Sequence, residues 1–458
     1  MQQSRLLSHG LHVFLLGSAL LAGVALRIFS TGPFTPLSCS LLNKGCLTNP
    51  PIQVLHVDND YAHVIDLFKN NIEKGDDIGA SVAAYVNGKL VLDVHGGWQD
   101  VDKGIPFTDN TMTMVYSSTK VLSAISVAYF VDKGLLSYDD KISKYWPEFA
   151  QGNKENVTLG DLMLHVAGVP FLDRPITSAE MEDPERFSSI LASQRHIFNG
   201  ERKRSYHATA GGWYINEILK RAANATVDSV AAKFNEDYDI EWHLKPYQQE
   251  YDDRISRFYW VPWHHWIYRQ ILGGMDTIKL FWYAITDKYQ VLVNVGAQIG
   301  PDGATPDLIT DLRYRRLEGP AYSGYTNARS IAKLAAMMAN GGKAIVQGEP
   351  DLLSAQTYAL ATEPMEPEYD LCIRMDIHST RGGFAIFDHL KIGGIEFTGW
   401  TGYSGSIFFW NAEYNIGFGF APNAILEGGI MPPDRRSIRL LEAIVNQAKH
   451  EKANNVST

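Results

Sequence analysis

The chain has 458 residues, of which 45% are hydrophobic and 20% are charged, and its formal net charge is −10. Such a length holds two or three average domains or one large catalytic unit. The composition is that of an ordinary globular protein, and the acidic balance gives no electrostatic footprint for nucleic acid. We therefore expect no nucleic-acid partner.

The first sixty residues differ from the rest because no acidic residue precedes Asp58. An uncharged apolar run extends from Val13 to Leu26, behind Arg5. Its length is typical of the apolar region of a secretory signal peptide, and an uncleaved signal anchor is the closest alternative. Residues 1–30 are therefore predicted to be a signal peptide or signal anchor, which leaves the catalytic part secreted or membrane-anchored on the lumenal or extracellular side. A mitochondrial transit peptide is the third option.

Two further features bear on the compartment and on metals. Glycosylation is expected in a secretory lumen at three Asn-x-Ser/Thr sequons, namely Asn156, Asn224 and Asn455. Among three cysteines at most one pair can form: Cys39 with Cys46 would close a small loop, and the alternative is three free thiols, including Cys372. No Cys/His cluster has zinc-site spacing, so we expect no metal.

Residues 31–57 contain four prolines among small polar residues and are predicted to be a linker. The folded domain is expected at about 58–450, followed by a tail at 451–458. Two β-rich runs, 78–85 and 89–94, are joined by Asn87-Gly88, which supplies the positive φ angles of a tight hairpin turn. A second hairpin is predicted from runs 405–410 and 415–421 around turn residues 411–414.

Between the two hairpins, apolar residues recur at helical spacing. Helices are predicted over 120–133, 159–165, 212–221, 328–340 and, after the second hairpin, 435–450. Strands at both ends and helices between them predict an α+β fold, in which both chain ends complete one antiparallel sheet. A mainly helical region, at about 105–325, is inserted between the sheet-forming ends.

A candidate nucleophile, Ser117, stands three residues before Lys120 at the start of a strongly apolar helix. Positions i and i+3 share a helix face, so the serine hydroxyl and the lysine amine can meet. A partly buried lysine loses its charge more easily, and the neutral amine can take the serine proton. Ser-x-x-Lys alone is weak evidence, because it recurs at Ser330 to Lys333 inside another predicted helix.

Several other segments accompany this motif in a fixed order: 114–120, 158–170, 206–208, 211–213, 322–329, 341–342 and 398–405. Together they resemble serine β-lactamases, penicillin-binding proteins and β-lactamase-like carboxylesterases over about residues 58–449. The resemblance implies a β-lactamase/transpeptidase-like fold with an antiparallel sheet flanked by helices. It also implies a hydrolase that works through an acyl-enzyme and without a cofactor.

The resemblance further implies roles for individual residues. Ser117 attacks a carbonyl carbon, while Lys120 and Tyr206 accept its proton and later deliver one to the leaving group. An oxyanion hole is expected from the backbone N–H groups of Ser117 and Tyr403. Four more residues are expected to border the substrate: Ala208, Trp400, Thr401 and Gly402.

Ala208 and Trp400 depart from the pattern of class C β-lactamases, which carry Asn two residues after the Tyr, and of most relatives, which begin the third motif with Lys or His. In those relatives, the polar side chains at these two positions would bind the amide and carboxylate of a β-lactam or peptide. We therefore expect a small or lipid-like ester or amide substrate, and Trp400 itself resembles the third motif of β-lactamase-like carboxylesterases. The alternatives are a peptidase or β-lactamase, and a non-catalytic relative that binds or assembles.

The stretch 241–283 is dense in aromatic residues. Helical-domain core is the prediction, and the alternatives are the wall of an apolar acyl pocket or a surface against a membrane. Membrane association through the N-terminal segment is also expected if that segment is an anchor. The chain lacks a Gly-x-Ser-x-Gly elbow, a phosphate-binding Gly-rich loop and a His-Glu-x-x-His helix. The sequence therefore does not support an α/β-hydrolase, a nucleotide-binding protein or a zinc protease.

Overall fold

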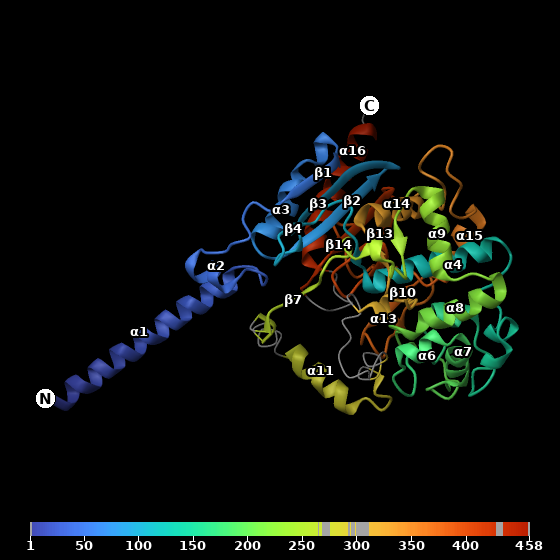
Figure 1. The fold of residues 1–458 in the computed structure, drawn as a ribbon, viewed down its shortest axis with the longest axis horizontal. Coiled ribbons are helices and arrows are strands. Elements are labelled where there is room, and N and C mark those ends of the chain that lie inside the picture. Colours follow the sequence, from blue (N-terminus) through green and yellow to red (C-terminus); the bar gives the residue numbers. More distant parts are fainter. Residues whose placement is uncertain are drawn as a thin grey trace.

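A computed structural model describes residues 2–263, 265–267, 275–291, 294, 298, 311–426 and 434–456. Within them, a ten-stranded antiparallel sheet forms the centre of the protein, in the order β1-β3-β2-β14-β13-β12-β11-β10-β9 with β4 on β3 (Figure 1). Its strands are β1 Ile52–Val57, β2 Gly79–Val86, β3 Lys89–Asp100, β4 Ile105–Pro106, β9 Glu368–Tyr369, β10 Asp376–Ser379, β11 Ala385–Ile386, β12 Thr398–Thr401, β13 Ile407–Asn411 and β14 Ile416–Pro422.

Both predicted hairpins are confirmed. Asn87 and Gly88, with φ angles of 53° and 74°, turn the chain between β2 and β3, and β13 pairs with β14. The two hairpins meet where β2 pairs with β14, from Val86 opposite Ile416 to Ala80 opposite Pro422. Every residue of these two strands is buried. The prediction that both chain ends complete one sheet is thus confirmed.

Helices cover both faces of this sheet. Helix α14 (Ala328–Ala339) packs closely on one face, because a Cβ added at Gly417 would lie 2.2 Å from the backbone nitrogen of Ala336. Helices α3 (His63–Glu73) and α16 (Arg435–Val456) cover the other face, where Phe68 contacts β3 at Gly96. Along β14, the alternation therefore places small residues such as Gly417 and Gly419 against α14 and bulky ones such as Phe418 on the opposite face.

The predicted helical region lies between the sheet-forming ends, and each predicted helix is present within a few residues of its expected bounds. Its α-helices, together with α15 beyond it, are α4 Thr119–Asp132, α5 Leu159–Met163, α6 Ser178–Glu182, α7 Pro184–Ser193, α8 Ala210–Ala223, α9 Val227–Tyr238, α11 Met275–Thr286, α13 Leu312–Arg315 and α15 Ala355–Ala361. Short 3₁₀ turns are η1 Asn59–Tyr61, η2 Tyr116–Ser118, η3 Ile142–Lys144, η4 Pro147–Phe149 and η5 Gln249–Tyr251. Two small sheets pair β5 Thr113–Met114 and β6 Trp242–His243 with β8 Tyr325–Thr326, and β7 Tyr259–Trp260 with β15 Ala424–Ile425.

The chain ends are more ordered than predicted. The predicted linker 31–57 contains helix α2 (Leu37–Leu42), a Cys39–Cys46 disulfide and strand β1, whose pairing with β3 places it in the sheet. Helix α16 continues to Val456, into the predicted tail. Residues Gln2–Ser30 form helix α1, and a signal peptide or anchor there remains a prediction, as does glycosylation. Among the described residues, no helix has both the length and the apolarity that crossing a bilayer requires.

The prediction that the aromatic stretch 241–283 is helical core is wrong for much of its described part. Trp242 and Phe258 are buried, because Trp242 packs against Phe408 of β13 and Phe258 meets the Tyr116 ring edge-on. Four tryptophans are more than half exposed: Trp260, Trp263, Trp266 and Trp282. Tyr268 and the side chain of Phe281 lie outside the described part of the chain.

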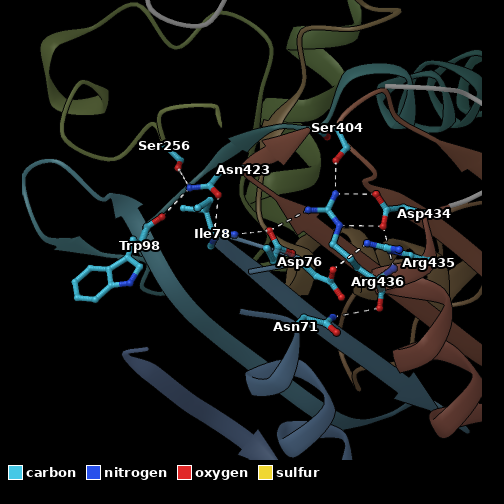
Figure 2. Close-up of polar contacts among 12 residues, drawn as sticks. Asn71, Asp76, Ile78, Trp98, Ser256, Ser404, Asn423, Asp434, Arg435 and Arg436 are labelled. Carbon is cyan, nitrogen blue, oxygen red and sulfur yellow. Dashed lines mark hydrogen bonds and ion pairs between the residues drawn. The ribbon is translucent and has the colours of Figure 1, made fainter. Parts of the chain in front are cut away.

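A buried ion cluster joins α16 to the start of β2 and to the turn after β12 (Figure 2). Arg436 is fully buried and donates to Asp434 at 2.7 Å and to Asp77 at 3.0 Å. Its guanidinium also donates to the backbone oxygen of Ser404 at 3.0 Å. Because two carboxylates and a carbonyl satisfy this cation, it can stay charged in the interior and fix three chain segments together.

Replacing Arg436 by Met should lower the free energy of unfolding by about 3–5 kcal/mol, because Asp77 and Asp434 would remain buried without a cation. The neighbouring Arg435, half exposed and 2.9 Å from Asp76, is the matched control, and its Ala variant should cost about 0.5–1 kcal/mol. Urea denaturation of both variants measures the difference. Equal losses would contradict a structural role for the buried cluster.

Candidate active site

The nucleophile segment is held by its neighbours while Ser117 faces the site. Tyr116, with φ at 45°, adopts a left-handed conformation that costs a non-glycine residue about 1 kcal/mol. This turn in η2 sets Ser117 at the start of α4. Ser118 bonds to the Ser406 hydroxyl at 2.9 Å, and Thr119 accepts from Gly324 N at 2.9 Å. These contacts fix the backbone on both sides of Ser117.

The structure brings Ser117, Lys120 and Tyr206 together from two elements. Lys120 Nζ lies 3.3 Å from Ser117 Oγ, one turn along the helix start, as the spacing predicted. Tyr206, from the segment before α8, donates its phenol proton to Ser117 Oγ at 2.7 Å. The serine hydroxyl therefore contacts both groups that the sequence assigned to proton transfer.

Lys120 is held by neutral groups. Its Nζ donates to Ala208 O at 2.6 Å and to Ala321 O at 2.8 Å, and no described carboxylate forms an ion pair with it. A cavity of about 30 Å³, lined largely by apolar side chains, borders the amine. Burial accordingly holds the pKa of Lys120 well below its usual 10.5. A neutral amine has two N–H bonds for the two carbonyls and one lone pair left for Ser117.

Tyr206 is packed between aromatic rings that fix its direction. The Trp400 ring stacks on it at 5.4 Å and the His165 ring meets it edge-on at 5.1 Å. Burial raises the pKa of Tyr206 above its ordinary value, so the phenol keeps its proton. Burial thus favours the neutral amine at Lys120 and the protonated phenol at Tyr206.

Two histidines behind Tyr206 were not among the predicted site residues. His207 donates from Nδ1 to Ser205 O at 2.7 Å and accepts at Nε2 from Val169 N at 3.3 Å. His165 accepts at Nδ1 from His207 N at 3.3 Å. Burial lowers the pKa of both rings, that of His207 to about 3, so both are neutral supports. His165 lies in a segment that carried the family resemblance, which is the only sequence signal for it.

A buried ion pair also positions Tyr206. Asp370 accepts from the backbone N of Tyr206 at 3.2 Å and from that of Cys372 at 2.9 Å. Its other carboxylate oxygen lies 3.2 Å from Arg204 Nε. No motif links Asp370 to Tyr206, since the two are 164 residues apart, so this support could not be predicted from the sequence.

The third motif lies against the nucleophile segment. Trp400 and Thr401 of strand β12 are buried. A Cβ added at the next residue, Gly402, would lie 2.2 Å from Val115 O, so only glycine fits there. The Tyr403 ring follows at 5.8 Å from that of Tyr116. Within the described residues, the backbone N–H groups of Ser117 and Tyr403 donate to no other protein group. Both predicted oxyanion donors therefore remain available to a ligand.

The predicted substrate-bordering residues differ in what they contribute. Ala208 supplies its carbonyl to Lys120, and its side chain packs against the core. Trp400 is almost fully buried against Tyr206. The structure thus makes both of these residues supports of the predicted proton-transfer pair.

The second Ser-x-x-Lys motif shows why the spacing alone is uninformative. Ser330 Oγ donates to Asn327 at 3.0 Å and accepts from Glu241 N at 2.8 Å, at the start of α14. Lys333 Nζ lies 2.6 Å from a carboxylate oxygen of Glu349. This lysine has a counter-ion and its serine bonds to the N-cap residue Asn327, whereas no described carboxylate pairs with Lys120.

Comparisons with known proteins agree with this geometry. A family model described as Beta-lactamase matches residues 65–442. The chain is similar to the esterase/beta-lactamase LipL of Mycobacterium tuberculosis, at 24% identity over 365 residues that cover 77% of this chain and 79% of that protein.

Solved structures extend the likeness to the fold. A family VIII carboxylesterase superposes with a TM-score of 0.73 at 25% identity, over 87% of this chain and 100% of that one. A penicillin-binding protein homologue from Caulobacter crescentus gives a TM-score of 0.70 at 23% identity, over the same shares of both chains. Because the family model spans most of the chain, this protein belongs to the Beta-lactamase family and is a serine hydrolase of that family.

Proposed function

We propose that the protein is a carboxylesterase that works through an acyl-enzyme on Ser117. One observation carries the proposal: Ser117 Oγ lies 2.7 Å from Tyr206 OH and 3.3 Å from Lys120 Nζ, which also bonds to two backbone carbonyls. In the neutral amine that we propose, these two carbonyls take both N–H bonds. A lone pair then faces the serine proton, and a neutral lysine is the base that a serine nucleophile needs.

In acylation, Ser117 Oγ bonds to the ester carbonyl carbon as its proton passes to Lys120 Nζ. The backbone N–H groups of Ser117 and Tyr403 stabilise the oxyanion that forms. Tyr206 then protonates the leaving alcohol oxygen while the C–O bond breaks, and the Lys120 ammonium returns a proton to Tyr206. Lys120 is neutral again, and the acyl group remains on Ser117.

In deacylation, a water molecule attacks the acyl-enzyme carbonyl and gives its proton to Lys120. The C–O bond to Ser117 breaks, Ser117 Oγ regains a proton from the same pair, and the carboxylic acid leaves. The same two groups serve both half-reactions, because each half-reaction takes one proton from the attacking oxygen and gives one to the leaving oxygen.

The chemistry of the site favours esters over β-lactams and peptides. Ala208 and Trp400 stand where class C β-lactamases and most relatives carry polar side chains, and both pack against apolar or aromatic neighbours. A site without those polar partners leaves an amide or carboxylate of the substrate unsatisfied. The similarity to a family VIII carboxylesterase supports the same choice, whereas the name esterase/beta-lactamase of the relative LipL covers both activities.

Alanine at Ser117 should lower kcat/KM for p-nitrophenyl butyrate by about 10⁴-fold or more, because no acyl-enzyme can form. Ser330→Ala is the control: it removes the serine of the second motif, and activity should stay within about threefold of wild type. Ester turnover that survives at Ser117→Ala would place the nucleophile elsewhere. Saturable nitrocefin hydrolysis exceeding ester turnover, and lost in Ser117→Ala, would favour the β-lactamase alternative.

The pH dependence of kcat/KM reports the proton acceptor. Activity requires neutral Lys120, so kcat/KM should rise with pH through the lowered pKa of this amine and level off well below pH 10.5. The residual activity of Lys120→Met should lack this acidic limb. A limb with its midpoint near 10.5 in the wild type would show that Lys120 is charged in the resting site.

A further inference from the structure

An exposed group of aromatic and aliphatic side chains follows strand β7. Four tryptophans there, Trp260, Trp263, Trp266 and Trp282, are between 54% and 74% exposed, and Ile278 and Ile285 are 61% and 62% exposed. These six residues are called the aromatic platform below. Scattered apolar residues are normal on a soluble surface, but several tryptophans within one short segment are not.

The aromatic platform adjoins the end of helix α1. The Phe29 ring meets the His265 ring edge-on at 5.2 Å, which joins the last turn of α1 to the platform segment. Leu16, Leu20 and Leu21 of the same helix are about 70% exposed. In Figure 1, α1 extends to the left of the molecule and α11 lies at its bottom, both away from α14 and α15. The last turn of α1 therefore adjoins the segment that carries the platform.

The charge of these segments is opposite to that of the whole chain. Residues 1–57 contain three basic residues and no acidic one, and residues 258–286 contain two basic residues and one acidic residue. The chain as a whole carries −10. A positively charged apolar face on an acidic protein is complementary to anionic lipid headgroups and not to a second copy of the acidic body.

A row of ring contacts leads from the aromatic platform to the nucleophile. Trp260 lies 6.1 Å from Tyr403, and Tyr403 lies 5.8 Å from Tyr116, which directly precedes Ser117. Phe258, next to the platform in sequence, meets the Tyr116 ring edge-on at 5.5 Å. An acyl chain that enters at the platform can therefore stay in contact with aromatic surface as far as Ser117.

We propose that the aromatic platform lies in the interface of an anionic lipid bilayer, and that the esters hydrolysed at Ser117 are lipid esters that reach it along Tyr403. Tryptophan suits this place because its ring is apolar while its N–H remains near the headgroups. The bilayer contact stands independently of catalysis, whereas the substrate class rests on the proposed function.

The test is flotation of the full-length protein with vesicles of phosphatidylcholine alone and of phosphatidylcholine with phosphatidylserine. Wild type should bind the anionic vesicles more tightly. The variant Trp263→Ala/Trp266→Ala/Trp282→Ala keeps α1 and should bind at least about tenfold more weakly. The control Leu135→Ala/Val346→Ala/Tyr369→Ala removes three side chains elsewhere that are 45–49% exposed and should bind as wild type does. Urea denaturation verifies that both variants are folded.

Activity assays separate the surface from the chemistry. The triple tryptophan variant should retain wild-type kcat/KM for soluble p-nitrophenyl butyrate and lose about tenfold for a long-chain ester embedded in anionic vesicles. If vesicle binding behaves as expected but neither ester is hydrolysed, the platform stands and the proposed function fails. Absent vesicle binding, undiminished binding of the tryptophan variant, or a wild-type dimer that this variant abolishes would overturn the bilayer contact.

Discussion

The pairing of β2 with β14 is the constraint on which the remainder of the structure depends. It places Ala80 opposite Pro422, so more than three hundred residues are closed into one loop between two buried strands. The entropy lost in closing so long a loop is recovered by the buried apolar area of both strands and of α14. Arg436 then ties the terminal helix to Asp77 and to the turn at Ser404. The third motif begins on β12, which lies two strands away from β14 in the same sheet. The pairing of β2 with β14 therefore also places this motif beside the nucleophile segment.

Burial has opposite consequences for two groups that touch the same serine. It lowers the pKa of Lys120, whose charged form loses hydration, and raises the pKa of Tyr206, whose charged form is the phenolate. In the proposed mechanism, one dry environment therefore prepares a base and an acid without any further charged partner. Lys333 lies in a similar helix start but has Glu349 as its counter-ion, and this pairing is what separates a structural lysine from the catalytic one proposed here.

Local patterns predicted the parts of the fold that depend on local chemistry. The turn residues Asn87-Gly88 were sufficient to predict the β2–β3 hairpin, and the helical spacing of 120–133 was sufficient to predict α4. Ser117 and Lys120 were within reach of prediction because one helix turn brings them together, whereas Tyr206 needed the family resemblance. Asp370 could not be predicted, since its contact with Tyr206 exists only after the sheet has formed. The prediction of helical core for the aromatic stretch 241–283 was wrong for a different reason. Composition measures how apolar a segment is but not whether its side chains face protein or solvent, so the exposure of the tryptophans could not be predicted from it.

The central claim is that a neutral Lys120 activates Ser117, and labelling with a fluorophosphonate tests it most directly, because the probe requires an activated serine and no knowledge of the substrate. The full-length protein at pH 7.5 should be modified at Ser117, as mapped by peptide mass spectrometry. Labelling should fall about 10³-fold in a folded Lys120→Met variant and remain unchanged in Lys333→Met, in keeping with the general-base contribution of one residue. Equal labelling of wild type and Lys120→Met, or modification at another serine, would contradict the account.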